Sequence, residues 1–177
     1  MKKGFFNSSI HIACFLILCF SCFICKAQNQ DSIASKDMSF LNFSYITPDE
    51  VTHSLYETKT PYILIYFYNP ECEVCSKIKI RLSKNEHLNF MIEKKMVTVL
   101  AILPDVKKEY WLENIKFIPN NWLNGWIEND QLIIKAYLKT VPTFFLLDKD
   151  RNIINNSETK AIQNWINEER NNEDNDN

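Results

Sequence analysis

The sequence predicts an α/β fold with a mixed sheet that contains a parallel β-α-β unit and ends in an antiparallel hairpin plus a helix. Residues 62–68 and 97–103 are apolar runs without alternation, which is typical of strands buried on both faces. A helical pattern separates them, so we expect the two strands to pair in parallel. Residues 143–147 predict a further strand, and the turn and short apolar run after it predict the antiparallel edge.

The 177 residues suit one domain with accessory segments. We expect a signal peptide over residues 1–27, a polar linker over 28–40, the folded domain over 41–170 and a disordered acidic tail over 171–177. The formal net charge of −2 is balanced, so the composition gives no indication of nucleic-acid binding.

The N-terminal segment has the layout of a secretory signal peptide. Lys2 and Lys3 precede a short apolar run over residues 12–24, and Ala27 offers a small residue for cleavage, with Cys25 two residues before it. We therefore expect cleavage after Ala27, export to the periplasm or cell envelope, and no membrane span in the mature chain.

Two alternatives to cleavage after residue 27 remain open. An uncleaved membrane anchor is one, although the apolar run is shorter than the about 20 residues that a span needs. A lipoprotein cleaved before Cys22 is the other, but Cys19 stands three residues before it where a leucine is usual.

Export changes the meaning of the remaining cysteines. Four of the six cysteines lie within the first 27 residues: Cys14, Cys19, Cys22 and Cys25. The mature chain then keeps only Cys72 and Cys75, which form a C-x-x-C pair. Because exported proteins meet an oxidising compartment, such a pair favours a redox role.

Two segments outside the main strands carry local signals. Thr47, followed by Pro48 and by Glu50 three residues on, has the pattern of a helix N-cap and predicts a short helix. Residues 118–126, rich in asparagine and tryptophan, predict a loop in which Gly125 takes a positive φ. Residues 131–138 fit either a helix or an extended segment.

The C-x-x-C pair lies where the first buried strand meets its helix. Val74, Ile78 and Leu82 form one apolar stripe of that helix, so Cys72 falls near its N-cap and Cys75 one turn inside. The unpaired N–H groups and the dipole of a helix start stabilise a thiolate there. We therefore expect Cys72 to be the exposed nucleophile and Cys75 the resolving thiol.

Three other roles for this pair stay open. A zinc site needs about four ligands, and the mature chain adds only His53 and His87, at no standard spacing, so we expect no metal and no cofactor. A purely structural disulfide would close so short a loop that it would remove little chain entropy. The third possibility is a redox-capable fold that is kept only for binding.

A second motif completes a resemblance. The segment "NPECEVC" at a helix start, followed about 65 residues later by "TVPTFFLLD", resembles the thioredoxin superfamily, and in particular its exported TlpA-like thiol-disulfide oxidoreductases. The resemblance implies a three-layer α/β/α sandwich. It also implies a cis peptide bond before Pro142 that lies against the C-x-x-C, with the Val141 backbone pairing to substrate. The implied partners are thiols and disulfides of exported proteins and an upstream redox partner.

The chain departs from the family at several positions. Glu71 replaces the usual aromatic residue before the first cysteine, and Glu73-Val74 is an unusual central dipeptide. A carboxylate on each side of Cys72 is expected to raise its thiol pKa. We therefore predict a reducing protein, nearer thioredoxin at about −270 mV than the oxidant DsbA at about −120 mV. Tyr66 stands where thioredoxin has a buried aspartate, so proton handling must differ.

The predicted loop contains two tryptophans that could lie either at the substrate or in the core. Trp122 and Trp126 could form a rim that faces the substrate, but aromatic side chains dominate core burial, and we expect both to pack on the core. We expect the same of Tyr110 and Trp111.

Overall fold

The computed structural model describes residues 39–104, 106–128, 131–156 and 159–176. In this part of the chain seven strands form one mixed sheet in the order β2-β1-β5-β4-β3-β6-β7. The strands are β1 (Ser44–Ile46), β2 (Thr52–Ser54), β3 (Tyr62–Phe67), β4 (Val97–Leu103), β5 (Leu123–Trp126), β6 (Thr143–Leu147) and β7 (Ile153–Asn156).

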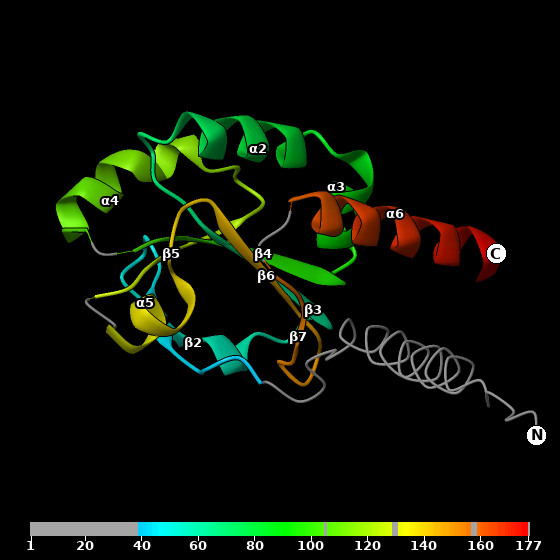
Figure 1. Ribbon diagram of the computed structural model, residues 1–177, viewed down its shortest axis with the longest axis horizontal. Coiled ribbons are helices and arrows are strands. Elements are labelled where there is room, and N and C mark those ends of the chain that lie inside the picture. The colour runs from blue at the N-terminus through cyan, green and yellow to red at the C-terminus, as the bar shows by residue number, and fades with distance from the viewer. Residues whose placement is uncertain (1–38, 105, 129–130, 157–158, 177) are drawn as a thin grey trace, which may run out of the picture. The chain divides into compact units, whose positions relative to one another are not determined.

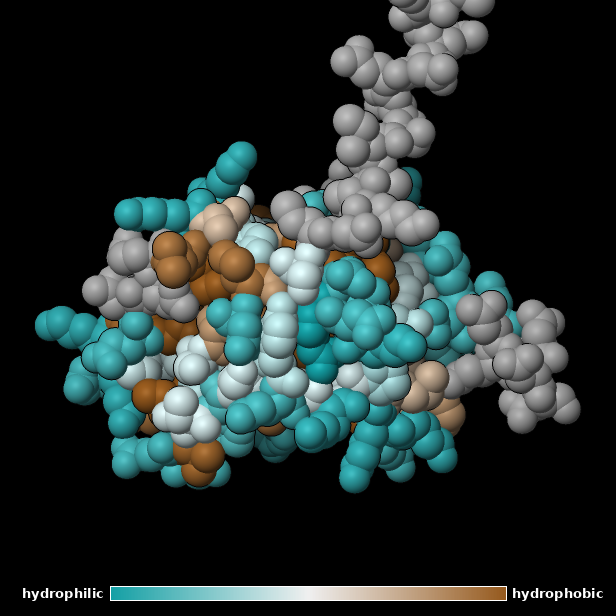
Figure 2. All heavy atoms as spheres, turned by 90° about the horizontal axis from the view of Figure 1, so that it is seen from below, coloured by the Kyte–Doolittle hydropathy of each residue, from teal (hydrophilic) through white to brown (hydrophobic). Residues whose placement is uncertain are grey.

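Helices cover both faces of this sheet. They are η1 (Leu55–Glu57), α2 (Glu73–Ser83), α3 (Glu86–Glu93), α4 (Lys108–Asn114), η2 (Ile115–Phe117), α5 (Gln131–Tyr137) and α6 (Thr159–Asp176). Helices α2, α3, α4 and α6 lie on one face, and α5 lies on the other (Figure 1). The face with α5 exposes hydrophobic side chains among hydrophilic ones (Figure 2), and Leu132 of α5 is 74% exposed.

The centre of the sheet is parallel and its edges are antiparallel. Strand β3 pairs in parallel with β4, and β4 with β5. On the other side, β3 pairs antiparallel with β6, and β6 with β7. This pattern confirms the predicted β-α-β unit and the antiparallel C-terminal hairpin followed by a helix.

Strand β3 explains why its sequence shows no alternation of polar and apolar residues. Leu64 and Tyr66 belong to the core under α2, α3, α4 and α6, together with Tyr68 just beyond the strand. Ile63 and Ile65 belong to the opposite core, as does Phe67. Both faces of a central strand are therefore covered, which requires a continuous apolar run.

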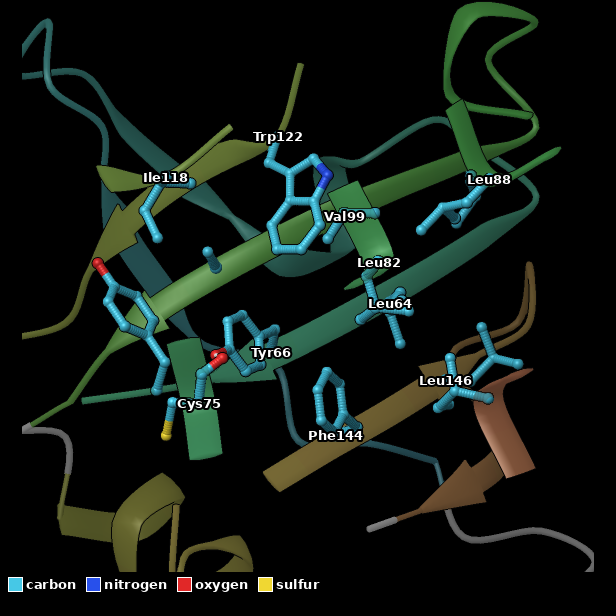
Figure 3. Packing of buried hydrophobic residues seen from close by; sticks show 14 of the residues in the cluster. Leu64, Tyr66, Cys75, Leu82, Leu88, Val99, Ile118, Trp122, Phe144 and Leu146 are labelled. Carbon is cyan, nitrogen blue, oxygen red and sulfur yellow. The ribbon is translucent and has the colours of Figure 1, made fainter. Parts of the chain in front are cut away.

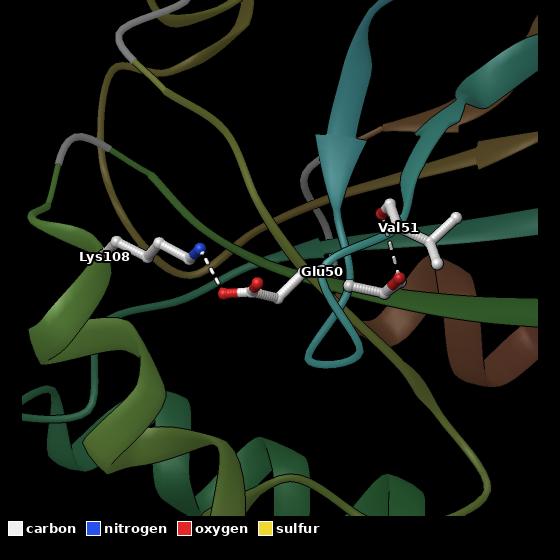
Figure 4. Close-up of polar contacts among 4 residues, drawn as sticks. Glu50, Val51 and Lys108 are labelled. Atoms are coloured by element: carbon white, nitrogen blue, oxygen red, sulfur yellow. Dashed lines mark hydrogen bonds and ion pairs between the residues drawn. The ribbon is translucent and has the colours of Figure 1, made fainter.

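The helix predicted at Thr47 is wrong. The chain turns there between β1 and β2, because the Glu50 N–H donates to the Thr47 carbonyl at 2.8 Å and the Thr47 N–H to the Val51 carbonyl at 3.0 Å. Glu50 takes a φ of 66°, which a helix does not allow. Its carboxylate pairs with Lys108 Nζ at 2.8 Å (Figure 4). The antiparallel pairing of β1 with β2 requires a tight turn here, so the local capping pattern is overridden.

The loop predicted over residues 118–126 is wrong in its second half, which forms β5. Gly125 pairs with Ile102 inside the sheet, and its φ is not positive. Glycine is required there for space: a Cβ atom would lie 2.6 Å from Ile102 Cδ1 and 3.0 Å from Tyr45 Cδ2. The segment predicted as helix or extended over residues 131–138 is the helix α5.

The ends of the domain differ from the predicted boundaries. Phe40 belongs to the predicted linker, but its side chain is fully buried. Its ring stacks on Tyr137 with the centroids 4.0 Å apart, and its N–H donates to the Arg151 carbonyl at 2.8 Å. Helix α6 continues to Asp176, so the described tail is helical rather than disordered, and the segment contains no glycine or proline that would end it. The signal peptide prediction lies outside the described residues.

Gly125→Ala is expected to lower the free energy of unfolding by about 1–3 kcal/mol, because the added methyl overpacks a rigid site between two sheet side chains. Urea unfolding measures this loss. Ile102→Val removes the nearest atom, so the cost of Gly125→Ala should be smaller in that background. Equal costs in both backgrounds would show that Ile102 is not the obstacle.

Candidate active site

The connection between β3 and α2 fixes the position of the cysteine pair. Asn69 organises the turn: its side-chain oxygen accepts the Glu71 N–H at 2.8 Å, and its carbonyl accepts the Cys72 N–H at 3.1 Å. Such an Asx turn lets a short polar side chain replace backbone partners. Helix α2 then begins at Glu73 with Cys72 as its N-cap.

Cys72 and Cys75 form a disulfide with their Cα atoms 5.2 Å apart. The Cys72 sulfur accepts the backbone N–H of Cys75 at 3.1 Å, as an N-cap side chain does. Cys75 is 1% exposed, whereas Cys72 is only partly buried. One sulfur therefore lies against a helix N–H group at the surface, and the other lies beneath it.

Residues far along the chain complete the surroundings of the pair. The Val141–Pro142 peptide bond is cis, which confirms that sequence prediction. The Val141 carbonyl oxygen lies 3.9 Å from the Cys72 sulfur. Pairing of Phe67 with Thr143 in the β3–β6 ladder causes this approach, because it brings the end of one strand beside the start of the other.

The two predicted carboxylates have different surroundings. Glu73 pairs with Lys77 at 2.6 Å, one helical turn on, and both side chains are largely exposed. Glu71 is also exposed, and its Oε1 lies 3.3 Å from the Tyr110 hydroxyl. Lost solvation raises the pKa of Tyr110, and the Glu71 carboxylate raises it further. Glu71 is thus the carboxylate beside Cys72 that has no cation in contact among the described residues.

Tyr66 takes a different role from the aspartate that it replaces. Its side chain is fully buried, and its hydroxyl donates to the Cys75 carbonyl at 2.8 Å. The ring stacks on Phe144 with centroids 4.8 Å apart, close beside Cys75 (Figure 3). Burial raises the pKa of Tyr66, so the phenol stays protonated and acts as a donor.

The core packing predicted for the other aromatic residues is confirmed. Trp122 and Trp126 are 5% and 6% exposed and belong to the core, as predicted. Trp111 is fully buried, and Tyr110 is partly buried and packs against the same core, as predicted, with its hydroxyl beside Glu71. A surface tyrosine on a helix gives no sequence signal for this contact, which depends on where α4 lies.

Metal and membrane features can be examined only within the described ranges. There, no three His, Cys, Asp or Glu side chains gather into a group that could hold a metal ion. No helix of the same ranges has both the length and the apolar character that a membrane span requires.

Comparison with known proteins supports the fold. No protein-family model and no curated protein matches this chain. Among solved structures, it is similar to a thioredoxin-like protein from Bacteroides caccae, with 28% identity and a TM-score of 0.66. That match covers 73% of this chain and 48% of that protein, so this chain spans about half the length of its relative.

Two shorter structures match over most of their length. The thioredoxin domain of a thiol-disulfide oxidoreductase from Bacteroides vulgatus is 20% identical, with a TM-score of 0.62 over 76% of this chain and 99% of that one. A thiol:disulfide interchange protein from a Bacteroides species is 20% identical, with a TM-score of 0.61 over 73% and 88%. The fold is therefore thioredoxin-like, which confirms the predicted fold class and the resemblance to the thioredoxin superfamily.

Tyr66→Phe is expected to lower the free energy of unfolding of the oxidised protein by about 1 kcal/mol, because the variant loses a buried hydrogen bond but keeps the ring. Urea unfolding measures this difference. Tyr62→Phe is the matched control, since the Tyr62 hydroxyl makes no hydrogen bond to a described residue and its loss should change little. Equal losses in the two variants would contradict a role for the contact with Cys75.

Proposed function

We propose that this protein is a thiol-disulfide oxidoreductase that exchanges disulfides with other proteins through Cys72 and Cys75. The observation that carries the proposal is the asymmetry of the pair: the partly exposed Cys72 sulfur caps α2 and accepts an N–H group, while Cys75 is enclosed. An anionic sulfur at a helix start is stabilised by that N–H group and by the helix dipole. Oxidoreductases with the same fold among the solved structures support this reaction class.

In the proposed reaction, the Cys72 thiolate attacks one sulfur of a substrate disulfide. A mixed disulfide forms, and the other substrate sulfur leaves as a thiolate that takes a proton from water. Cys75 then loses its proton and attacks the Cys72 sulfur, which releases the second substrate thiol. Two electrons pass to the substrate, the Cys72–Cys75 disulfide forms, and an upstream dithiol must reduce it again.

The cis-proline segment is the proposed substrate contact. The Val141 carbonyl lies 3.9 Å from the Cys72 sulfur, and both Val141 and Pro142 are partly exposed. A peptide strand that presents its cysteine to Cys72 would therefore pass the Val141 backbone, where main-chain hydrogen bonds could align it. This contact would hold any sequence, since main-chain groups are common to all peptides.

The compartment is also a proposal. The basic start and short apolar run of residues 1–27 support export, and with it a cell-envelope location and partners among exported proteins. Cell fractionation with N-terminal sequencing of the mature chain tests this, and an intact N-terminus in the cytoplasm would contradict it.

Cys75→Ser is expected to accumulate mixed disulfides with partner proteins, because the nucleophile stays and the resolving thiol is lost. Cys72→Ser should abolish insulin reduction and trap nothing. Turnover in the presence of a chemical dithiol, and capture in the native host followed by identification of the partners, are the measurements. The Cys72→Ser protein is the matched control for unspecific capture.

A second candidate function predicts the opposite result. If the Cys72–Cys75 bridge stays oxidised and the fold serves only for binding, the wild type reduces no disulfide with any donor. The trapping variant then captures nothing beyond its control, and the oxidoreductase proposal fails.

The potential is expected to lie nearer about −270 mV than about −120 mV, because carboxylates beside Cys72 oppose its thiolate. Glu71→Gln should raise the potential by about 10 mV, a roughly twofold change in the equilibrium with glutathione, since exposed charges act weakly. The control Glu73→Gln/Lys77→Gln removes a charge together with its partner and should change it less. A wild-type value near that of DsbA, or equal shifts in both variants, would contradict this.

A further inference from the structure

A pocket of about 320 Å³ opens beside the cysteine pair. Ser76 and Lys79 of α2 form one wall, Tyr110 of α4 and Phe117 of η2 form the other, and Glu71 lies at the α2 start. Ser76 follows Cys75 directly and donates its N–H to the Cys72 carbonyl at 3.1 Å. The pocket therefore adjoins the disulfide, and neither Val141 nor Pro142 lines it.

Lys79 is the cation of this pocket, and it is only partly exposed. Burial removes part of the water around the Lys79 ammonium and lowers its pKa. Its ammonium lies 6.0 Å from the centre of the Phe117 ring, and no carboxylate of the described residues pairs with it. Lys77 on the same helix, by contrast, pairs with Glu73.

Tyr68 provides a second donor that lacks an acceptor. The side chain is 3% exposed and lines the pocket, and its hydroxyl has no hydrogen-bond partner among the described residues. Burial raises the pKa of Tyr68, so the hydroxyl keeps its proton. A buried hydroxyl without a partner destabilises the protein, and a ligand atom that accepts its proton would remove that penalty.

We propose that this pocket binds an aspartate or glutamate side chain of the substrate polypeptide, close to the cysteine that reacts with Cys72. The Lys79 ammonium supplies the charge, and the Tyr68 hydroxyl donates to the carboxylate. The rings of Tyr110 and Phe117 contact the methylene groups. This inference rests on the proposed function and adds a preference for acidic substrate sequences.

The Glu71 carboxylate weakens this preference for acidic substrates. Its carboxylate lies at the same pocket, carries the same sign as the ligand and is exposed beside the Tyr110 hydroxyl. It repels an acidic side chain, but less than the less exposed Lys79 attracts it, because exposed charges are screened by water. Removing this carboxylate should therefore strengthen the preference.

Peptides that contain one cysteine as a mixed disulfide with a chromophoric thiol provide the test. Aspartate stands in turn at each position flanking the cysteine, and asparagine at the same position is the reference. For the best position, the second-order rate constant with reduced full-length protein should favour aspartate about tenfold, as expected for a charge-assisted hydrogen bond. Lys79→Gln should abolish most of this ratio, Tyr68→Phe should reduce it, and Glu71→Gln should increase it.

Lys84→Gln is the matched control, because it removes the same charge at the end of α2, outside the pocket, and should keep the ratio. Equal rates for aspartate and asparagine at every position, or a ratio that survives in Lys79→Gln, would overturn the pocket proposal while exchange itself still proceeds. If Lys79→Gln changed the exchange rate with oxidised glutathione but not with the peptides, the proposal that the pocket binds a polypeptide side chain would be overturned. Absence of exchange with every peptide would refute the proposed function, and this inference with it.

Discussion

The antiparallel pairing of β3 with β6 is the constraint on which the rest of the site depends. Its register sets Phe67 opposite Thr143, so the chain that leaves β3 toward Cys72 runs beside the chain that enters β6 from Pro142. All residues of β6 and all of β3 except Tyr62 are buried, and a slip by one residue would turn every core side chain to the wrong face. The same packing that stabilises the sheet thus fixes a carbonyl group against a reactive sulfur.

One column of aromatic side chains links the core to the cysteine pair. Tyr66 stacks between Phe144 and Tyr68, and its edge contacts Trp122. This column fills the space beneath Cys75 with aromatic rings, and the group that reaches the Cys75 carbonyl is the Tyr66 hydroxyl, which donates. In the proposed exchange, the base that takes the Cys75 proton therefore reaches the pair from the solvent side, where water and exposed carboxylates are available.

Features of this fold that depend on the local sequence can be predicted from it, whereas features that depend on distant contacts cannot. Strands buried on both faces and the helix after the cysteines depend on local composition, and they were predicted almost to the residue. The turn at Thr47 and the strand around Gly125 depend on pairing with other strands. The β1–β2 pairing closes the turn, and Tyr45 and Ile102 require a residue without a side chain at position 125. Local capping and turn patterns cannot carry such information.

The two carboxylates beside Cys72 show the same difference between local sequence and tertiary structure. Sequence alone treated Glu71 and Glu73 as equivalent neighbours of Cys72, because both flank it. The helix makes them different: a spacing of four residues gives Glu73 a cation in Lys77. Glu71 precedes the helix, and among the described residues its carboxylate contacts the neutral Tyr110 hydroxyl and no cation. Lys79, three residues after Ser76 on α2, lines the pocket that Glu71 also lines, and no carboxylate of the described residues pairs with it. An anion and a cation without an ion-pair partner among the described residues therefore flank one opening beside the disulfide, which is the basis of the acidic-substrate preference proposed above.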